Sequence, residues 1–387
     1  MTAVLLLDAS ALQLGWLSVL GVLPGVFVAW WAGAWIDRRS RRNVMIGADW
    51  IRAMVIASVP AAALLGSVSL MHLGIVAALV CVATVMFEIA DHAMLPAIVG
   101  RERLVAANAR RETIDATAEI GGPPLGGLLV QWLSAPLALA VDAFSFVASA
   151  LAIGRIRARE PIVDGGVIPA DATQSPSLRQ PPSLLREALG GLDLVWRNPL
   201  LRRLLLSTTL LTLFMNFLAS LYTLYALRTL NVTPWLLGLV IGCGGVGALI
   251  GESLVARLVA RFGAVPTATF ALIAGGLSQV FIPLAPADPA GGAAFLMISQ
   301  LLGDGLLTMY LITETSLRQK AVADEALGRA AAVWKMSASI VAPIGMILGA
   351  VLAETVGIRQ ALWGLVIGAS VAALPLVLPG STPKNSE

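Results

Sequence analysis

Charged residues are scarce in this chain. Asp, Glu, Lys and Arg together make up 13% of the 387 residues, about half of the roughly 25% that soluble domains carry. Hydrophobic residues reach 58%, and the mean hydropathy is +0.85. A chain of this size cannot hide so much apolar surface from water in cores of its own. The shortage of charge therefore excludes an ordinary soluble protein and favours one embedded in a lipid bilayer.

Residue types that carry enzyme chemistry are also few. None of the three lysines follows a glycine, so the chain has no G-x-x-x-x-G-K-[ST] phosphate loop with which to use ATP. Cys81 and Cys243 lie in apolar runs, which is typical of small buried residues and not of a disulfide or a metal site. His72 and His92 belong to no zinc-binding motif. The sequence predicts neither an enzyme nor a protein with a cofactor or metal.

Long apolar runs are what the chain has in abundance. Eleven are long enough to cross a bilayer as helices, at residues 11–36, 43–66, 71–96, 112–133, 136–155, 201–226, 235–258, 266–285, 292–315, 332–355 and 358–379. They do not alternate with polar residues as strands do, and a helix satisfies its own backbone hydrogen bonds in lipid. We expect an all-α membrane protein with about eleven transmembrane helices.

The arginines cluster in every second loop between these runs. Basic clusters follow the first, third, fifth, seventh and ninth runs, at residues 38–42, 101–111, 155–159, 257–261 and 318–329. Because cytoplasmic loops carry the excess of Lys and Arg, these loops are expected in the cytoplasm of a bacterial inner-membrane protein. This distribution indicates membrane topology and not nucleic-acid binding.

A polar, Pro-rich stretch interrupts the apolar pattern. Residues 158–198 are interpreted as a cytoplasmic linker that ends in an interfacial amphipathic helix. The linker divides an N-terminal transmembrane bundle, 1–157, from a C-terminal bundle, 199–380, which is followed by a cytoplasmic tail, 381–387.

The two bundles repeat each other at one constant offset, called here the repeat offset, which carries Leu14-Gly15 onto Leu237-Gly238. It also carries Arg38 onto Arg261, Gly122 onto Gly345, and Gly126 onto Gly349. Weak internal symmetry of this kind is a feature of transporters. At the repeat offset the run 201–226 has a partner that would end near residue 3. We therefore predict two six-helix bundles, with the first helix largely missing from this chain.

Two short motifs carry a family resemblance. The segment GAWIDRRSRR resembles the loop signature of the major facilitator superfamily at Gly33, Asp37, Arg38, Arg41 and Arg42. Ser40 departs from that pattern, because many members have Gly there. The resemblance implies a fold of two six-helix bundles and a gate in which the acidic and basic side chains close the cytoplasmic side. The alternative is that the arginines only set topology.

The second motif is GPPLGG. It resembles the antiporter motif of the drug/proton antiporter branch at Gly122, Pro123, Gly126 and Gly127, although Ala118 departs from the pattern upstream. Pro bends a helix and glycines allow close helix approach, so the motif implies a hinge; plain helix packing is the alternative. Over nearly the whole chain, the resemblance points to the branch with macrolide efflux proteins and the enterobactin exporter.

Ionisable residues inside the apolar runs are candidates for function because they are costly to bury in lipid. Glu88, Asp91, Glu119 and Asp304 are the candidate proton or substrate carriers. Each could instead form a cytoplasmic latch or a hydrogen bond between helices. Asp49 and Arg52 lie three residues apart, so we expect these two side chains to neutralise each other.

Together these features predict a secondary transporter that exports small amphipathic compounds, drug-like or siderophore-like, by proton antiport and alternating access. Its expected partners are the small-molecule substrate, protons and the bilayer, and it is expected to act as a monomer. Import of a metabolite by the same fold is the first alternative. A non-transporting membrane protein is the second, because of the missing helix.

Overall fold

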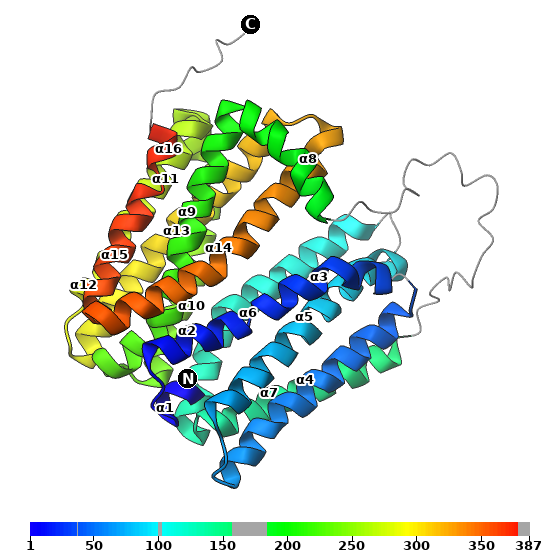
Figure 1. Ribbon diagram of the computed structural model, residues 1–387, viewed down its shortest axis with the longest axis vertical. Helices are drawn as coiled ribbons and strands as arrows, with labels where there is room; N and C mark the ends of the chain where they lie inside the picture. The colour runs from blue at the N-terminus through cyan, green and yellow to red at the C-terminus, as the bar shows by residue number, and fades with distance from the viewer. Residues whose placement is uncertain (37, 100–102, 157–183, 378–387) are drawn as a thin grey trace, which may run out of the picture. The chain divides into compact units, whose positions relative to one another are not determined.

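The computed structural model describes residues 1–36, 38–99, 103–156 and 184–377, and within these residues it contains helices and no strands (Figure 1). Asp37 of the gating motif, most of the predicted linker and the predicted tail lie outside the described residues. The predicted all-α membrane fold is confirmed.

The helices follow the apolar runs closely. The first half contains α1 (Thr2–Leu5), α2 (Ala11–Leu20), α3 (Leu23–Ile36), α4 (Arg41–Leu64), α5 (Leu70–Val99), α6 (Leu104–Leu133) and α7 (Ala135–Arg155). The second half contains α8 (Leu184–Arg197), α9 (Pro199–Leu224), its π-helical end η4 (Tyr225–Thr229), α10 (Pro234–Phe262), α11 (Ala264–Ser278), α12 (Phe281–Leu284), α13 (Pro289–Ala321), the 3₁₀ turn η5 (Asp324–Ala326), α14 (Leu327–Val356), α15 (Ile358–Val371) and α16 (Leu374–Val377).

Local sequence explains several helix ends. Ser40 caps α4, since its Oγ accepts a hydrogen bond from the Asn43 amide. Asn198 and Asp288 cap α9 and α13 in the same way, each followed by Pro at the first helical position. Pro24 cannot donate a backbone hydrogen bond, and the helix is interrupted just before it, between α2 and α3.

Ten helical stretches among the described residues are long and apolar enough to cross a membrane. They match ten of the eleven predicted spans. The eleventh, 112–133, forms as part of α6, a helix of 30 residues. It is not among the ten: its first half carries Arg110, Arg111, Glu112 and Asp115, and its second half includes Pro123 and Pro124. A helix, α8, forms where the interfacial helix is predicted; its location at the membrane surface remains a prediction.

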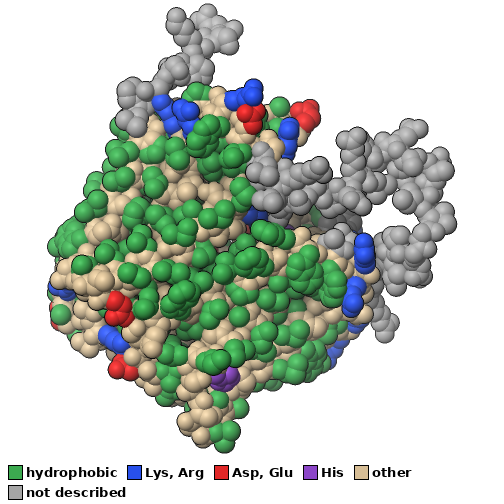
Figure 2. Space-filling view, in the orientation of Figure 1, with side chains coloured by type: hydrophobic (Ala, Val, Ile, Leu, Met, Phe, Trp, Pro, Cys, Tyr) green, Lys and Arg blue, Asp and Glu red, His purple; other side chains and the backbone are tan. Residues whose placement is uncertain are grey.

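The hydrophobic surface fits a lipid environment. Large apolar side chains stand exposed along the helices, including Trp30 and Trp31 of α3 and Phe144 of α7. Figure 2 shows hydrophobic side chains over most of the visible face and charged side chains mainly toward its margins. Such exposure is unfavourable in water and ordinary in a bilayer.

The chain forms two compact units. The first comprises residues 1–9, 16–118 and 129–184, and the second comprises 10–15, 119–128 and 185–387. The core of the first unit joins α3, α4, α5 and α7 through Ile36, Met45, Met94 and Ile153. The core of the second joins α9, α10, α11, α13 and α14, with Tyr310 fully buried in it. The predicted boundaries at 157 and 199 remain predictions.

The internal repeat is visible in the helix boundaries. At the repeat offset, both ends of α6 fall on both ends of α14. The first residues of α2, α4 and α7 fall on the first residues of α10, α11 and α15, respectively. The turns repeat as well. Ser134 has a φ of 85° and Gly357 one of 92°, while Asp8 has 50° and Asn231 55°. Positive φ at a non-Gly residue is uncommon, so these matched turns show one fold unit used twice.

Helix packing inside each unit follows the same repeat. In the first unit α4 packs on α5 and α7, and α3 packs on α5; in the second α11 packs on α13 and α15, and α10 packs on α13. Helix α9 packs on α14 and α15. It has no counterpart among the described residues, because moving it back by the repeat offset places nearly all of it before residue 1.

Candidate functional site

A buried ion pair lies in the first unit. The Arg52 guanidinium binds the Asp49 carboxylate one helical turn away, and both residues are buried. The guanidinium carbon lies 4.4 Å from the ring centroid of Phe87 and 4.5 Å from that of Phe146. The pair therefore joins α4 to α5 and α7. The prediction that Asp49 and Arg52 neutralise each other is confirmed.

The basic part of the gating motif holds helix ends together. Arg41 Nη1 donates to the Ala93 carbonyl of α5 at 2.7 Å. Arg42 donates to the carbonyls of Ile153 and Gly154, near the C-terminus of α7. Cations suit the negative end of a helix dipole, so Arg42 stabilises that end of α7.

The rest of this motif is less constrained. Arg38 is exposed. A Cβ added to Gly33 would meet no atom within 4 Å, so no steric need for glycine is evident there. The gating role of the motif remains a prediction.

The GPPLGG motif packs against α10 within the second unit. A Cβ on Gly238 would collide with the Pro123 carbonyl, and one on Gly127 with the Pro234 carbonyl. Gly242 continues the contact, 2.8 Å from the Ile120 carbonyl when its Cβ is added. Helices approach this closely only where side chains are absent.

The other two glycines of the motif do not share this contact. A Cβ at Gly122 or Gly126 would meet nothing within 4 Å. The expected close approach is therefore made by Gly127 and the glycines of α10, not by the pair Gly122 and Gly126.

We expect Gly238→Ala to damage the protein although Ala favours helix formation by about 1 kcal/mol over Gly. The new methyl group must push α6 and α10 apart, since the neighbouring atoms are backbone. The midpoint temperature of thermal unfolding should fall by several degrees. It is measured on detergent-solubilised protein by the loss of the monodisperse peak in gel filtration after heating. Gly121→Ala, on α6 with nothing within 4 Å, is the matched control and should be neutral or stabilising. Equal midpoints for the two variants would contradict the packing argument.

Asp304 is the best-placed intramembrane carboxylate. It lies in α13, partly buried, and a Cβ on Gly244 of α10 would collide with its Oδ2 atom. Gln300 Nε2 donates to the same oxygen at a long 3.5 Å. Glu119 and Tyr222 are close enough to interact with it electrostatically. Asp304 therefore has weak hydrogen bonding and an acidic neighbour.

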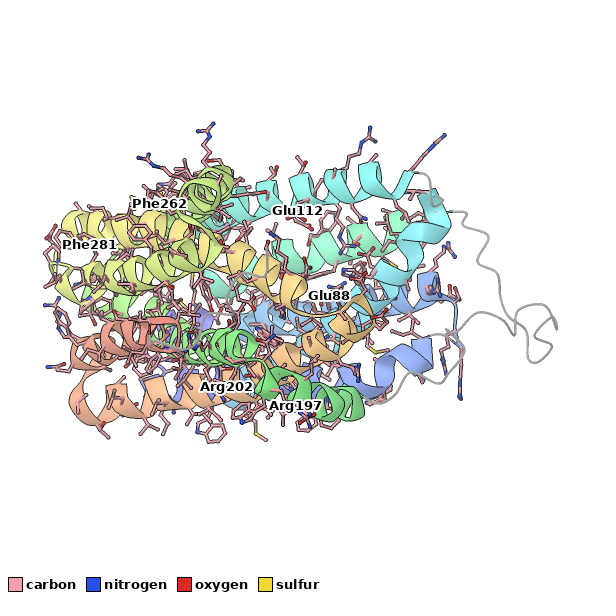
Figure 3. The ribbon with its side chains drawn as sticks, turned by 90° about the horizontal axis from the view of Figure 1, so that it is seen from above. Glu88, Glu112, Arg197, Arg202, Phe262 and Phe281 are labelled. Atoms are coloured by element: carbon pink, nitrogen blue, oxygen red, sulfur yellow. The ribbon has the colours of Figure 1, made fainter. Side chains whose placement is uncertain are left out.

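The acidic candidates of the first unit line a different site. Glu88 of α5 and Glu112 of α6, both labelled in Figure 3, border one polar cavity of about 730 Å³. Its lining is Glu88, His92, Leu95, Leu104, Asn108, Arg111, Glu112 and Asp115. Asp91 adjoins this set, because Arg111 Nη1 lies 2.7 Å from Asp91 Oδ2. Arg111 Nε also lies 3.7 Å from Asp115 Oδ2.

The four carrier candidates thus separate into two groups, with Glu88 and Asp91 in the first unit and Glu119 and Asp304 in the second. Sequence reasoning did not nominate Glu112, Asp115 or Tyr222. Glu112 and Asp115 lie three residues apart and so share a helix face, a spacing from which a paired acidic site could have been predicted. The sequence around Tyr222 contains no such pattern. Its buried hydroxyl has no hydrogen-bond partner among the described residues. No group of three metal-binding side chains occurs in the described part of the chain.

The repeated helical units, lipid-compatible surface and intramembrane carboxylates define a polytopic membrane protein of the transporter class. Comparison with known proteins gives the family: the Major Facilitator Superfamily profile matches residues 2–321 and 204–387. The chain belongs to the Major Facilitator Superfamily.

Two of the relatives are efflux proteins. The chain is 25% identical over 370 residues to macrolide efflux protein A of Streptococcus pyogenes, covering 96% of this chain and 87% of that protein. It is 26% identical over 382 residues to the multidrug efflux pump Tap of Mycolicibacterium fortuitum, with the same coverage.

Solved structures agree on the fold. A bacterial homologue of the iron transporter ferroportin in its inward-facing state superposes with a TM-score of 0.73 at 18% identity, covering 97% of this chain and 91% of that one. The nucleoside transporter NupG gives 0.73 at 14% identity, with the same coverage. At such identities the likeness concerns the fold alone.

Proposed function

We propose that this protein exports small amphipathic compounds, of drug or siderophore type, in exchange for protons. The observation that carries the proposal is Asp304, a partly buried carboxylate inside a membrane-spanning helix, packed against Gly244 and close to Glu119. Ionisable groups in such positions commonly serve proton or substrate pathways. The macrolide and multidrug efflux proteins among its relatives support export over import.

In this mechanism Asp304 takes up a proton when the transporter opens to the outside and releases it to the cytoplasm. Release restores the negative charge, which favours binding of a cationic substrate for the outward step. Glu119 is the second carboxylate of this cluster. The exchange follows alternating access, in which the two states differ in which side of the bilayer reaches the site.

In this mechanism the two sequence motifs serve as the gate and the hinge. Asp37 with Arg38, Arg41 and Arg42 closes the cytoplasmic side, and the contact between the GPPLGG segment and α10 acts as the hinge. Tight glycine packing suits a hinge because the two helices can rotate on each other without side chains interlocking.

The test is efflux of ethidium, a fluorescent organic cation, from bacteria that lack their main efflux pumps and express this chain. Efflux should exceed that of empty-vector cells, and a protonophore should return it to the vector rate. Export at vector level would contradict the proposal for cations of this class, and protonophore-insensitive export would contradict proton coupling. An immunoblot of the membrane fraction controls for expression.

A further inference from the structure

Helix α8 is held against the second unit by one of its faces. A Cβ on Gly191 would collide with the Arg329 carbonyl near the start of α14. Val195 is fully buried in the core of the same unit. Gly191 and Val195 lie four residues apart and therefore share a helix face. Because this face is fixed to the protein, the opposite face of α8 has a fixed outward orientation.

The outward face of α8 carries exposed apolar side chains. Leu192 is 38% exposed and Trp196 is 53% exposed, again four residues apart. Helix α9 begins two residues after α8 ends, and its Leu206 is 40% exposed. Tryptophan is enriched where a protein meets the surface of a membrane. Among the described residues, the two helices thus leave an apolar surface uncovered where they join.

Positive charge borders this apolar surface. The Arg197 side chain is 80% exposed, and its Nε atom lies 2.8 Å from the Asp193 carboxylate. Arg202 is exposed and Arg203 is half-buried, both in the first turns of α9; Arg197 and Arg202 are labelled in Figure 3. Three arginines and one aspartate leave residues 191–206 with a net charge of +2. The surface therefore favours a partner with negative charge.

The order of groups along α9 matches that of a phospholipid. Leu206 lies four residues after Arg202 and shares its helix face, so it stands about 6 Å further along the helix. Helix α9 opens one of the stretches long and apolar enough to cross a membrane. A guanidinium near the start of this stretch is thus followed, one turn deeper, by exposed apolar surface. A phosphate bound at Arg202 would leave its acyl chains beside Leu206.

We propose that the joint between α8 and α9 binds one anionic phospholipid. Arg197 and Arg202 bind its phosphate, because the guanidinium offers paired donors that match the phosphate oxygens. Trp196 and Leu206 contact its acyl chains. The excess of positive charge selects an anionic headgroup over a zwitterionic one. The site anchors the start of the second unit to the leaflet predicted to face the cytoplasm, and it does not rest on the proposed export.

Trp196 supplies the probe for the experiment, because bromine on an acyl chain quenches tryptophan fluorescence only on close approach. The full chain is reconstituted in vesicles of phosphatidylcholine with a minority of phosphatidylglycerol. The bromine is on the phosphatidylglycerol in one preparation and on an equal amount of the phosphatidylcholine in the other, so that the headgroup composition is the same. The contribution of Trp196 is the difference between the unaltered protein and Trp196→Phe.

We expect the quenching of Trp196 to give a binding constant for phosphatidylglycerol roughly tenfold or more above that for phosphatidylcholine, because two arginines act together. The double variant Arg197→Gln with Arg202→Gln should reduce this preference to about twofold or less. The matched control is Arg257→Gln with Arg261→Gln, which removes the same charge from exposed positions of α10 and should keep the preference. Gel filtration verifies that each variant is monodisperse before reconstitution.

Four results would overturn the proposal. Equal quenching by the two brominated lipids would mean that the joint meets the bilayer without selecting a headgroup. Quenching by neither would mean that another protein chain covers Trp196. A preference that survives the loss of Arg197 and Arg202 would assign it to other residues, and one lost equally in the α10 control would assign it to overall charge. None of these readouts depends on transport, so failure here is distinct from failure of the proposed export.

Discussion

Asp304→Asn is expected to lower ethidium efflux by at least about tenfold, equivalent to roughly 1.4 kcal/mol in the transport barrier, with little change in membrane abundance. Asn has nearly the same shape and still fits beside Gly244, but it can neither accept nor release a proton at neutral pH. The variant should therefore lose coupling to the proton gradient while keeping its fold. The measurement is the rate of ethidium uptake into inverted membrane vesicles under an imposed pH gradient, which corresponds to efflux from cells.

A second assay separates coupling from substrate binding. Exchange of labelled for unlabelled substrate across the membrane requires no net proton movement, so Asp304→Asn should retain it at substrate concentrations high enough to offset the loss of the Asp304 charge. Glu252→Gln is the matched control, because it also removes one carboxylate from a membrane span but at an exposed position of α10. Normal proton-driven efflux in Asp304→Asn would exclude this residue as the carrier and direct attention to Glu88, Asp91 and Glu119.

Asp49→Ala is expected to be the most destabilising substitution in the first unit. It removes the carboxylate that forms the ion pair with the buried Arg52 guanidinium and leaves only the electrostatic interaction with Asp142; breaking a buried pair costs about 3–5 kcal/mol. Both stacking contacts of the arginine, with Phe87 and Phe146, depend on its present position. The midpoint of unfolding in mixed SDS and mild detergent should shift to much lower SDS.

The double variant Asp49→Ala with Arg52→Met tests the cause. Replacing a buried pair by apolar side chains is often close to neutral, and Met fills the space between the two rings with a flexible apolar chain. The double variant should recover most of the lost stability. If Asp49→Ala alone were as stable as the wild type, the charge pair would have no structural importance.

The helices were predictable because lipid imposes a minimum length on every apolar run. The repeat was also readable, and Gly15, Gly122 and Gly126 already indicated an offset that the helix boundaries later matched. What the sequence could not show is which glycine faces which helix. Gly122, Gly126 and Gly127 look alike in GPPLGG, yet of these three only Gly127 contacts α10, because the partner helix is distant in the sequence and its packing leaves no local signal.

The candidate site was harder to predict than the fold. The partners of Arg41 and Arg42 include backbone carbonyls, which carry no sequence signal. Glu112 and Asp115 stood at the edge of a predicted span that began at residue 112, whereas α6 begins at Leu104. Residues 104–111 are too polar to resemble a membrane helix, so the cavity they help to line was not foreseen. Asp304 was nominated as an intramembrane charge, but its contact with Gly244 depends on the packing of α13 against α10.

The matched boundaries of the two halves have a practical consequence for engineering this chain. Helices α6 and α14 differ at most positions and yet start and stop in register, so the two halves have diverged in composition while keeping the same spacing. Inserting residues within either half would break that spacing. A fluorescent protein or affinity tag is better placed between residues 157 and 183, the stretch of sequence that separates the two halves of the repeat.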